Sequence, residues 1–193
     1  MPTNRFGHST YLVRRKVFKL LGASFHIYDP QGQLAFYSKM KAFKLKEDIR
    51  LYADESMQTE LLSIQARQII DFSAAYDVFD STTQQKVGAL RRKGLKSMLR
   101  DEWTIMDAHD QEIGLITEDS TVLALIRRFA TNLLPQTFHA TVRGTPVCEY
   151  KQHFNPFVFK LTVDFSADAA KAFDRRLGLA AAALLGAIEG RQG

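Results

Sequence analysis

Residues 177–188 read LGLAAAALLGAI, a run that is apolar on every side of a helix. A helix without a polar face must be enclosed, either by a lipid bilayer or by the rest of the protein. A transmembrane helix needs about 20 residues, which is more than this run offers, and charged residues flank it on both sides. We therefore expect no transmembrane span and a helix at the core of the protein, formed by Leu177, Leu179, Ala180, Ala181, Ala182, Ala183, Leu184, Leu185 and Ile188.

The composition is that of one cytoplasmic domain. The 193 residues contain no linker rich in Pro, Gly or Ser, so we expect a single domain over residues 1–193 with its core at 11–189. The N-terminal segment lacks the apolar stretch of a secretory signal, and the lone Cys148 cannot form an internal disulfide. The formal net charge of +5 predicts weak attraction to polyanions, or else a merely solvated basic surface.

Most of the chain before this helix alternates between apolar and polar residues, as half-buried β-strands do. A first strand is expected at 11–21 and a final strand at 157–165. Between them, alternating segments are separated by short polar stretches typical of hairpin turns. It predicts five hairpins, at residues 25–36, 43–64, 76–87, 103–115 and 138–147.

This repetition predicts a mainly β fold, with about twelve strands in a closed or stacked antiparallel meander. About eight strands already enclose an interior that side chains fill, so a twelve-stranded barrel needs further contents. The C-terminal helix is slim enough to occupy that interior, and we expect it to begin near Ser166 as its N-cap. A second, amphipathic helix is expected on the surface at 119–134.

Three stretches carry a family resemblance. The segment KVGALRRKGLKSMLRDEWTIMDAHDQEIGLI at 86–116 has a strand, a basic turn and a strand that starts with an aromatic residue. The segment FHIYDPQGQLAFYSKMKAFKLKEDIRLYADES at 25–56 has a hairpin, a lysine-rich strand and an acidic turn. The third is the closing strand with its hydrophobic helix. Together they resemble the tubby C-terminal-like superfamily, and within it the LURP-one-related and phospholipid-scramblase-like branch.

The resemblance implies a twelve-stranded barrel around a central hydrophobic helix. Tubby proteins bind phosphoinositides through a basic pocket, scramblase-like proteins associate with membranes, and the plant LURP-one-related branch is linked to defence. None of tubby's lipid-binding residues is carried over to positions of this sequence. The calcium-binding acidic segment and the palmitoylated cysteine cluster of scramblases have no counterpart here.

Two clusters of basic residues are candidate binding sites for anions. The first is the alternating set Lys39, Lys41, Lys44 and Lys46, and the second surrounds a predicted turn and contains Arg91, Arg92, Lys93, Lys96 and Arg100. A weaker candidate is the pair Arg127 and Arg128 on the predicted surface helix. Each cation near an anionic membrane contributes about 1 kcal/mol, which predicts salt-sensitive association on the micromolar scale. The alternative is a solvated strand face and an exposed turn with no ligand.

Motifs for catalysis and metal binding are missing from the sequence. The five histidines are scattered, with no second ligand at metal spacing, and there is no glycine-rich phosphate loop, nucleophile elbow or HExxH. Asp29, Asp80 and Asp107 recur at hairpin positions, which turn chemistry explains. We therefore expect no enzyme, no metal and no cofactor. Nucleic acid is a disfavoured partner, because the aromatic residues fall on the apolar side of the alternation.

These observations favour a non-enzymatic module that binds anionic phospholipid headgroups, such as phosphoinositides, or an acidic membrane surface. Its expected location is the cytoplasm, peripherally at the inner membrane surface. Two alternatives remain open. One is a protein-interaction or regulatory scaffold without a lipid ligand, and the other is a carrier of a small hydrophobic molecule, which would require a cavity beside the helix.

Overall fold

The computed structural model describes residues 5–18, 22–40, 48–67, 74–93, 102–119, 135–155 and 158–188. The predicted surface helix at 119–134 therefore lies outside the described residues, apart from Asp119. So do Lys41, Lys44, Lys46, Lys96, Arg100, Arg127 and Arg128.

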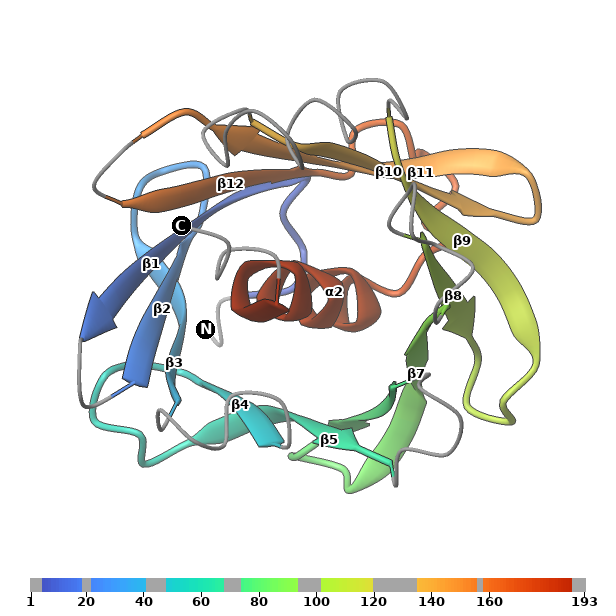
Figure 1. Cartoon of the computed structure of the whole chain (residues 1–193). Helices are drawn as coiled ribbons and strands as arrows, with labels where there is room; N and C mark the ends of the chain where they lie inside the picture. Colours follow the sequence, from blue (N-terminus) through green and yellow to red (C-terminus); the bar gives the residue numbers. More distant parts are fainter. Residues whose placement is uncertain are drawn as a thin grey trace.

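Twelve antiparallel strands form a closed barrel, as the hairpin repetition predicts (Figure 1). Each strand pairs with its neighbours in the sequence, and β1 pairs with β12 to close the ring. The strands are β1 (Thr10–Phe18), β2 (Gly22–Tyr28), β3 (Leu34–Met40), β4 (Asp48–Tyr52), β5 (Glu60–Ala66), β6 (Ala75–Asp80), β7 (Gln85–Arg92), β8 (Glu102–Met106), β9 (Glu112–Glu118), β10 (Thr137–Val142), β11 (Thr145–His153) and β12 (Phe159–Asp164).

The five predicted hairpins are confirmed as β2–β3, β4–β5, β6–β7, β8–β9 and β10–β11. Asp side chains shape their turns by accepting backbone hydrogen bonds, as Asx-turns do. The Oδ1 atom of Asp29 accepts from the N–H of Gln31 at 2.9 Å and of Gln33 at 2.8 Å, and Asp107 repeats the pattern in the β8–β9 turn. These turns gather at one end of the barrel, which we call the turn end. The opposite end, where β11 leads into Phe154, is called the Phe154 end.

The helix α2 (Arg175–Ile188) lies inside the ring of strands (Figure 1). Leu177 and the residues from Leu179 to Leu185 are at most 2% exposed. Large side chains from the strands, including Phe25, Phe36 and Tyr150, fill the space around it. Burial of so much apolar surface is the main source of the fold's stability. The prediction of a central hydrophobic helix is confirmed.

The fit around α2 depends on two glycines. A Cβ atom added at Gly178 would lie 2.4 Å from the Phe165 ring, and one added at Gly186 would lie 2.6 Å from the Phe25 ring. Both rings belong to fully buried side chains, so neither has room to move away. The hydroxyl of Tyr150 donates to the carbonyl of Gly178 at 3.1 Å, which fixes the helix against β11.

The predicted start of this helix is wrong. The helix begins at Arg175, and Ser166 lies in an exposed turn instead of capping it. The Asp168 side chain accepts hydrogen bonds from the N–H groups of Ala172 and Phe173, so it holds the segment in a turn by competing with helical bonding. Asp174 is the residue that caps the helix, because its Oδ1 atom accepts from the N–H of Arg176 at 2.9 Å.

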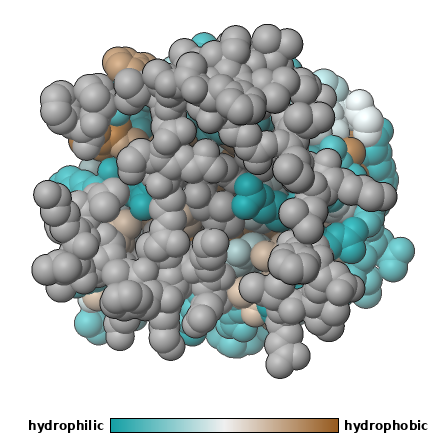
Figure 2. All heavy atoms as spheres, in the orientation of Figure 1, coloured by the Kyte–Doolittle hydropathy of each residue, from teal (hydrophilic) through white to brown (hydrophobic). Residues whose placement is uncertain are grey.

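No helix among the described residues is both long and apolar enough to cross a bilayer. Figure 2 shows the molecule in the orientation of Figure 1. Hydrophilic residues are prominent among the coloured atoms at its right and lower margins, and strongly hydrophobic residues are scattered.

Candidate functional site

Five cationic side chains share the outer surface of neighbouring strands. We call this set the basic face, and it consists of Arg14, Lys16, Lys39, Lys151 and Lys160. Alternation along β1 explains two of them, because Tyr11 and Val13 point into the barrel and leave Arg14 and Lys16 outside. All five are exposed except Lys160, which is half-buried. The face spans β11, β12, β1, β2 and β3, which are consecutive in the ring.

The strand register brings these cations close together. Lys160 on β12 lies directly opposite Arg14 on β1. Lys16 lies opposite Ser24 on β2, and Ser24 in turn lies opposite Lys39 on β3. Residues opposite one another on a sheet face have Cβ atoms about 5 Å apart, and like charges in that position destabilise the pair. The basic face therefore concentrates positive charge at a cost to stability.

No carboxylate of the described residues pairs with a cation of the basic face. The next strands of the ring, β4 to β7, differ. There Arg50 pairs with Asp48 and Glu60, and Arg67 and Lys86 both pair with Asp77 and Asp110. Charge that is not neutralised locally creates a positive potential that attracts anions.

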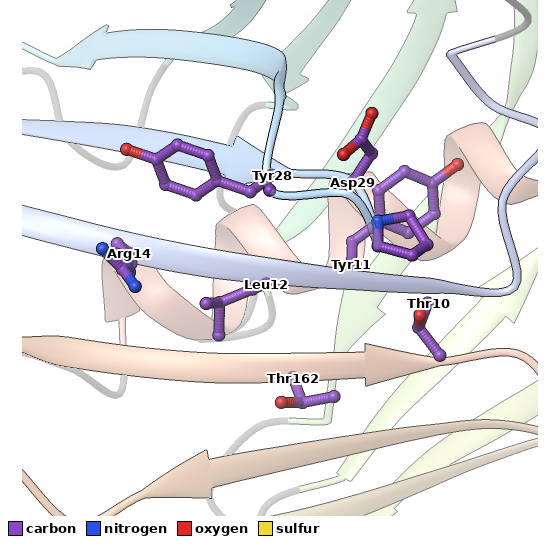
Figure 3. Close-up of a pocket in the computed structure, with 9 residues that line it drawn as sticks. Thr10, Tyr11, Leu12, Arg14, Tyr28, Asp29 and Thr162 are labelled. Carbon is purple, nitrogen blue, oxygen red and sulfur yellow. The ribbon is translucent and has the colours of Figure 1, made fainter.

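A shallow groove of about 400 Å³ runs along the basic face beside Arg14 (Figure 3). Leu12, Tyr28 and Thr162 line it, and the β2–β3 turn closes one end with the Asp29 carboxylate, which accepts backbone hydrogen bonds within that turn. The guanidinium carbon of Arg14 lies 5.3 Å from the centre of the Tyr28 ring, a cation–π arrangement that orients the arginine. A guanidinium beside apolar walls can bind a phosphate through two parallel hydrogen bonds.

Tyr11 also borders the groove, but its side chain is 2% exposed. Its hydroxyl donates to the carbonyl of Arg5 at 2.8 Å. Burial raises the pKa of Tyr11 to about 12, so the phenol stays neutral at physiological pH. Tyr11 therefore contributes no negative charge to the groove.

The structure separates the two basic clusters predicted from the sequence. Lys39 belongs to the basic face, whereas Arg91, Arg92 and Lys93 lie at the end of β7, and three strands stand between β3 and β7. Arg91 pairs with Glu112, and Lys93 pairs with Glu102. Arg92 is on the same side of β7 as the buried Leu90, facing the barrel interior. Anion binding by these three residues stays a prediction.

Sequence reasoning missed Arg14, Lys16, Lys151 and Lys160. These residues come from both ends of the chain and meet because β1 pairs with β12. Arg15 also obscured the pattern, because it interrupts the alternation of β1 with a charged residue that is 4% exposed. Its Nη1 atom donates to the carbonyl of Gly186, in the last turn of α2, at 3.1 Å. The alternation of β1 on its own was the signal that could have identified Arg14 and Lys16.

The described residues offer little for catalysis or metal binding. They contain no group of three or more His, Cys, Asp or Glu side chains placed to hold a metal ion. Burial raises the pKa of the Cys148 thiol, which keeps it protonated and weakly nucleophilic. The carboxylate Oδ1 atoms of Asp29, Asp80 and Asp107 accept hydrogen bonds within their own turns.

Known proteins resemble this chain to different degrees. A crystal structure of a protein from Arabidopsis thaliana is similar over 91% of this chain and 89% of that one, at 16% identity and a TM-score of 0.49. A search of curated proteins found no match. The family model described as LURP-one-related matches residues 34–186. The chain therefore belongs to the LURP-one-related family, which is part of the tubby-like superfamily.

Proposed function

We propose that this protein is a non-enzymatic module that binds anionic phospholipid headgroups, such as phosphoinositides, at an acidic membrane surface. The observation that carries the proposal is the basic face, whose five cations have no carboxylate partner among the described residues. Family membership adds support, since it suggests a tubby-like binding module. The anionic lipids of a cell concentrate in the cytoplasmic leaflet, so we propose a peripheral location at the inner membrane surface.

The magnitude of the charge effect predicts weak and reversible binding. Each cation near an anionic surface contributes about 1 kcal/mol, so five give about 5 kcal/mol, equivalent to a Kd of roughly 0.2 mM. This affinity is weaker than the micromolar scale expected from the sequence. Binding of this kind weakens as salt is added, because mobile ions screen the attraction.

The close packing around α2 argues against a carrier of small hydrophobic molecules. The helix is buried, and two of its glycines have no space for even one additional carbon. The residues of the groove beside Arg14 lie on the outer surface, which suits a headgroup better than an enclosed hydrophobic ligand.

Flotation with lipid vesicles tests the proposal. The protein is mixed with vesicles of phosphatidylcholine alone, of phosphatidylcholine with phosphatidylserine, and of phosphatidylcholine with a phosphoinositide, across a salt series. We expect binding to the two anionic compositions and a decline as salt rises. Absence of binding to both at low salt would overturn the proposal and favour the protein-interaction scaffold.

Matched variants locate the binding surface. One triple variant neutralises the basic face by Arg14→Gln, Lys16→Gln and Lys160→Gln, and a control variant removes the same charge by Arg50→Gln, Arg67→Gln and Lys86→Gln. We expect flotation to fall sharply in the first variant and slightly in the second. An equal loss in both would mean that net charge, not a particular face, drives binding.

A further variant tests the cluster that the sequence predicted on β7. Arg91→Gln with Lys93→Gln removes two cations that already pair with carboxylates. We expect this double variant to bind as the native protein does. If this double variant lost flotation while the basic face was intact, the binding surface would have to be assigned to β7 instead of β1 and β12.

A further inference from the structure

Phe154 is a large apolar side chain in an unusual place. It follows β11 directly and is 61% exposed, more than any other large hydrophobic residue among those described. The next most exposed is Met57, at 39%, in the β4–β5 turn at the opposite end of the barrel. A single exposed apolar residue is common and is not evidence of a site by itself. The cations near Phe154 distinguish it from an ordinary exposed apolar residue.

Cations of the basic face lie next to Phe154. The residue before it, His153 on β11, lies directly opposite Lys160 on β12, and Lys160 in turn lies opposite Arg14 on β1. Lys16 and Lys39 lie near the C-terminal ends of β1 and β3, and both strands end at the Phe154 end of the barrel. The residue after it, Asn155, is hydrogen-bonded to the start of the β12 region, because its Oδ1 atom accepts from the N–H of Val158 at 2.9 Å. An aromatic side chain is thus presented beside a positively charged surface.

The turn end of the barrel has the opposite character. Acidic residues outnumber basic ones in its hairpin turns, where Asp29, Asp54, Glu55, Asp80, Asp107 and Asp110 compare with one arginine, Arg143. Asp29, Asp54 and Asp107 have no cationic partner among the described residues, whereas Asp80 and Asp110 pair with arginine or lysine and Glu55 with His26. An anionic bilayer attracts the side of the barrel that carries the basic face and repels these turns. On approach to an anionic bilayer, this charge asymmetry favours the orientation with Phe154, not Met57, toward the lipid.

We infer that Phe154 inserts into the boundary between headgroups and acyl chains of an anionic bilayer while the basic face contacts the headgroups. Aromatic side chains favour this interfacial depth, and an apolar anchor combined with a cationic surface gives firmer attachment than either alone. The inference rests on the proposed function, because it assigns an orientation and an anchor to the same membrane-binding face.

Tryptophan fluorescence tests the orientation. The native chain has one tryptophan, Trp103, which is 2% exposed and therefore reports little of the surroundings. The variant Phe154→Trp is mixed with phosphatidylcholine–phosphatidylserine vesicles that carry brominated acyl chains, and Met57→Trp is the matched control. We expect a blue shift and quenching for Phe154→Trp and neither for Met57→Trp. An unquenched Phe154→Trp, or equal quenching of both, would overturn the inference.

Truncation of the side chain tests the anchor. Burying a phenylalanine side chain strengthens binding by about 30-fold, equivalent to about 2 kcal/mol. We expect Phe154→Ala to weaken binding to the anionic vesicles by that factor without changing its slope against salt concentration, and Met57→Ala to leave binding unchanged. Unaltered thermal unfolding of Phe154→Ala verifies that the barrel is intact, as its exposure predicts.

The two hypotheses fail in different ways. If the native protein binds anionic vesicles and Phe154→Ala binds equally well, the anchor is refuted and the proposed function stands. If the native protein does not bind anionic vesicles at low salt, the proposed function itself is refuted and the anchor with it.

Discussion

Arg14 and Arg15 are adjacent in β1 but belong to two different regions of the molecule. Arg14 lies on the outer surface beside Tyr28 and has no carboxylate partner among the described residues. Arg15 points into the barrel, where its guanidinium binds the carbonyl of Gly186. The inner region tolerates a charge only when the fold supplies a partner, whereas the outer region leaves charge available for a ligand. Substitutions inside the barrel should therefore affect stability, and those outside should affect binding.

The largest effect is expected from a new charge at the centre of α2. Ala182 is fully buried, so Ala182→Asp places a carboxylate in the barrel interior, where no site was built for it. We expect a cost of at least about 5 kcal/mol, enough to prevent folding of a domain with ordinary stability. Circular dichroism and yield of soluble protein measure this. A soluble, folded Ala182→Asp variant would show that α2 is not the core.

Asp168 is a buried charge for which the fold does supply partners, and its substitution tests how much those partners stabilise the protein. Its carboxylate pairs with the Arg175 guanidinium at 2.6 Å, and its side chain is 2% exposed. Burial alone would raise the pKa of Asp168, but the hydrogen bonds from Arg175, Phe173 and Ala172 outweigh burial and lower it. We expect Asp168→Asn to cost about 3 kcal/mol at neutral pH, because it leaves the Arg175 charge poorly paired.

The pH dependence of the same variant has a definite sign. A carboxylate whose folded-state pKa is depressed stabilises the fold fully above its unfolded pKa, about 4 for Asp, and this contribution disappears as pH falls through the folded-state pKa. The difference in unfolding free energy between native protein and Asp168→Asn should therefore shrink on acidification below pH of about 4. A difference that stays constant down to the acid limit would mean that the pKa of Asp168 is not depressed.

Arg15→Met is expected to have an intermediate effect. The substitution keeps the apolar stem but removes the hydrogen bond to Gly186 and the positive charge at the C-terminal end of α2. We expect a loss of about 2 kcal/mol in chemical denaturation. Unchanged stability would mean that Arg15, like Arg14, contributes little to the fold. The expected difference between the inner and outer sides of β1 would then be refuted.

The smallest effect on stability is expected from Arg14→Gln. This change removes the like charge opposite Lys160 and also the cation–π interaction with Tyr28, two small effects of opposite sign. Stability should therefore change by less than about 0.5 kcal/mol, while flotation with anionic vesicles declines. Arg67→Gln is the control outside the basic face, and it should lower stability by up to about 1 kcal/mol because Arg67 pairs with Asp77. If Arg14→Gln lowered stability as Arg67→Gln does, the basic face would have a structural role.

Sequence patterns were sufficient for the five hairpins because each hairpin is local. Each hairpin combines alternating residues with a turn, so the pairing of Tyr76 with Leu90 follows from a short segment. The start of α2 was not predictable in this way, since it depends on Asp168 binding the backbone of Phe173. The basic face depends on the pairing of β1 with β12, which joins residues about 150 positions apart. Lys160 could not be assigned to the same surface as Arg14 without that register.

The location of α2 also determines when the barrel can become stable during synthesis. All twelve strands precede α2 in the chain, yet their inner side chains pack against it. Strands that emerge from the ribosome therefore pair around an empty centre, and β1 must wait for β12 before the ring can close. Nascent chains of this protein consequently expose apolar surface until α2 has been synthesised, the condition under which chaperones bind folding chains.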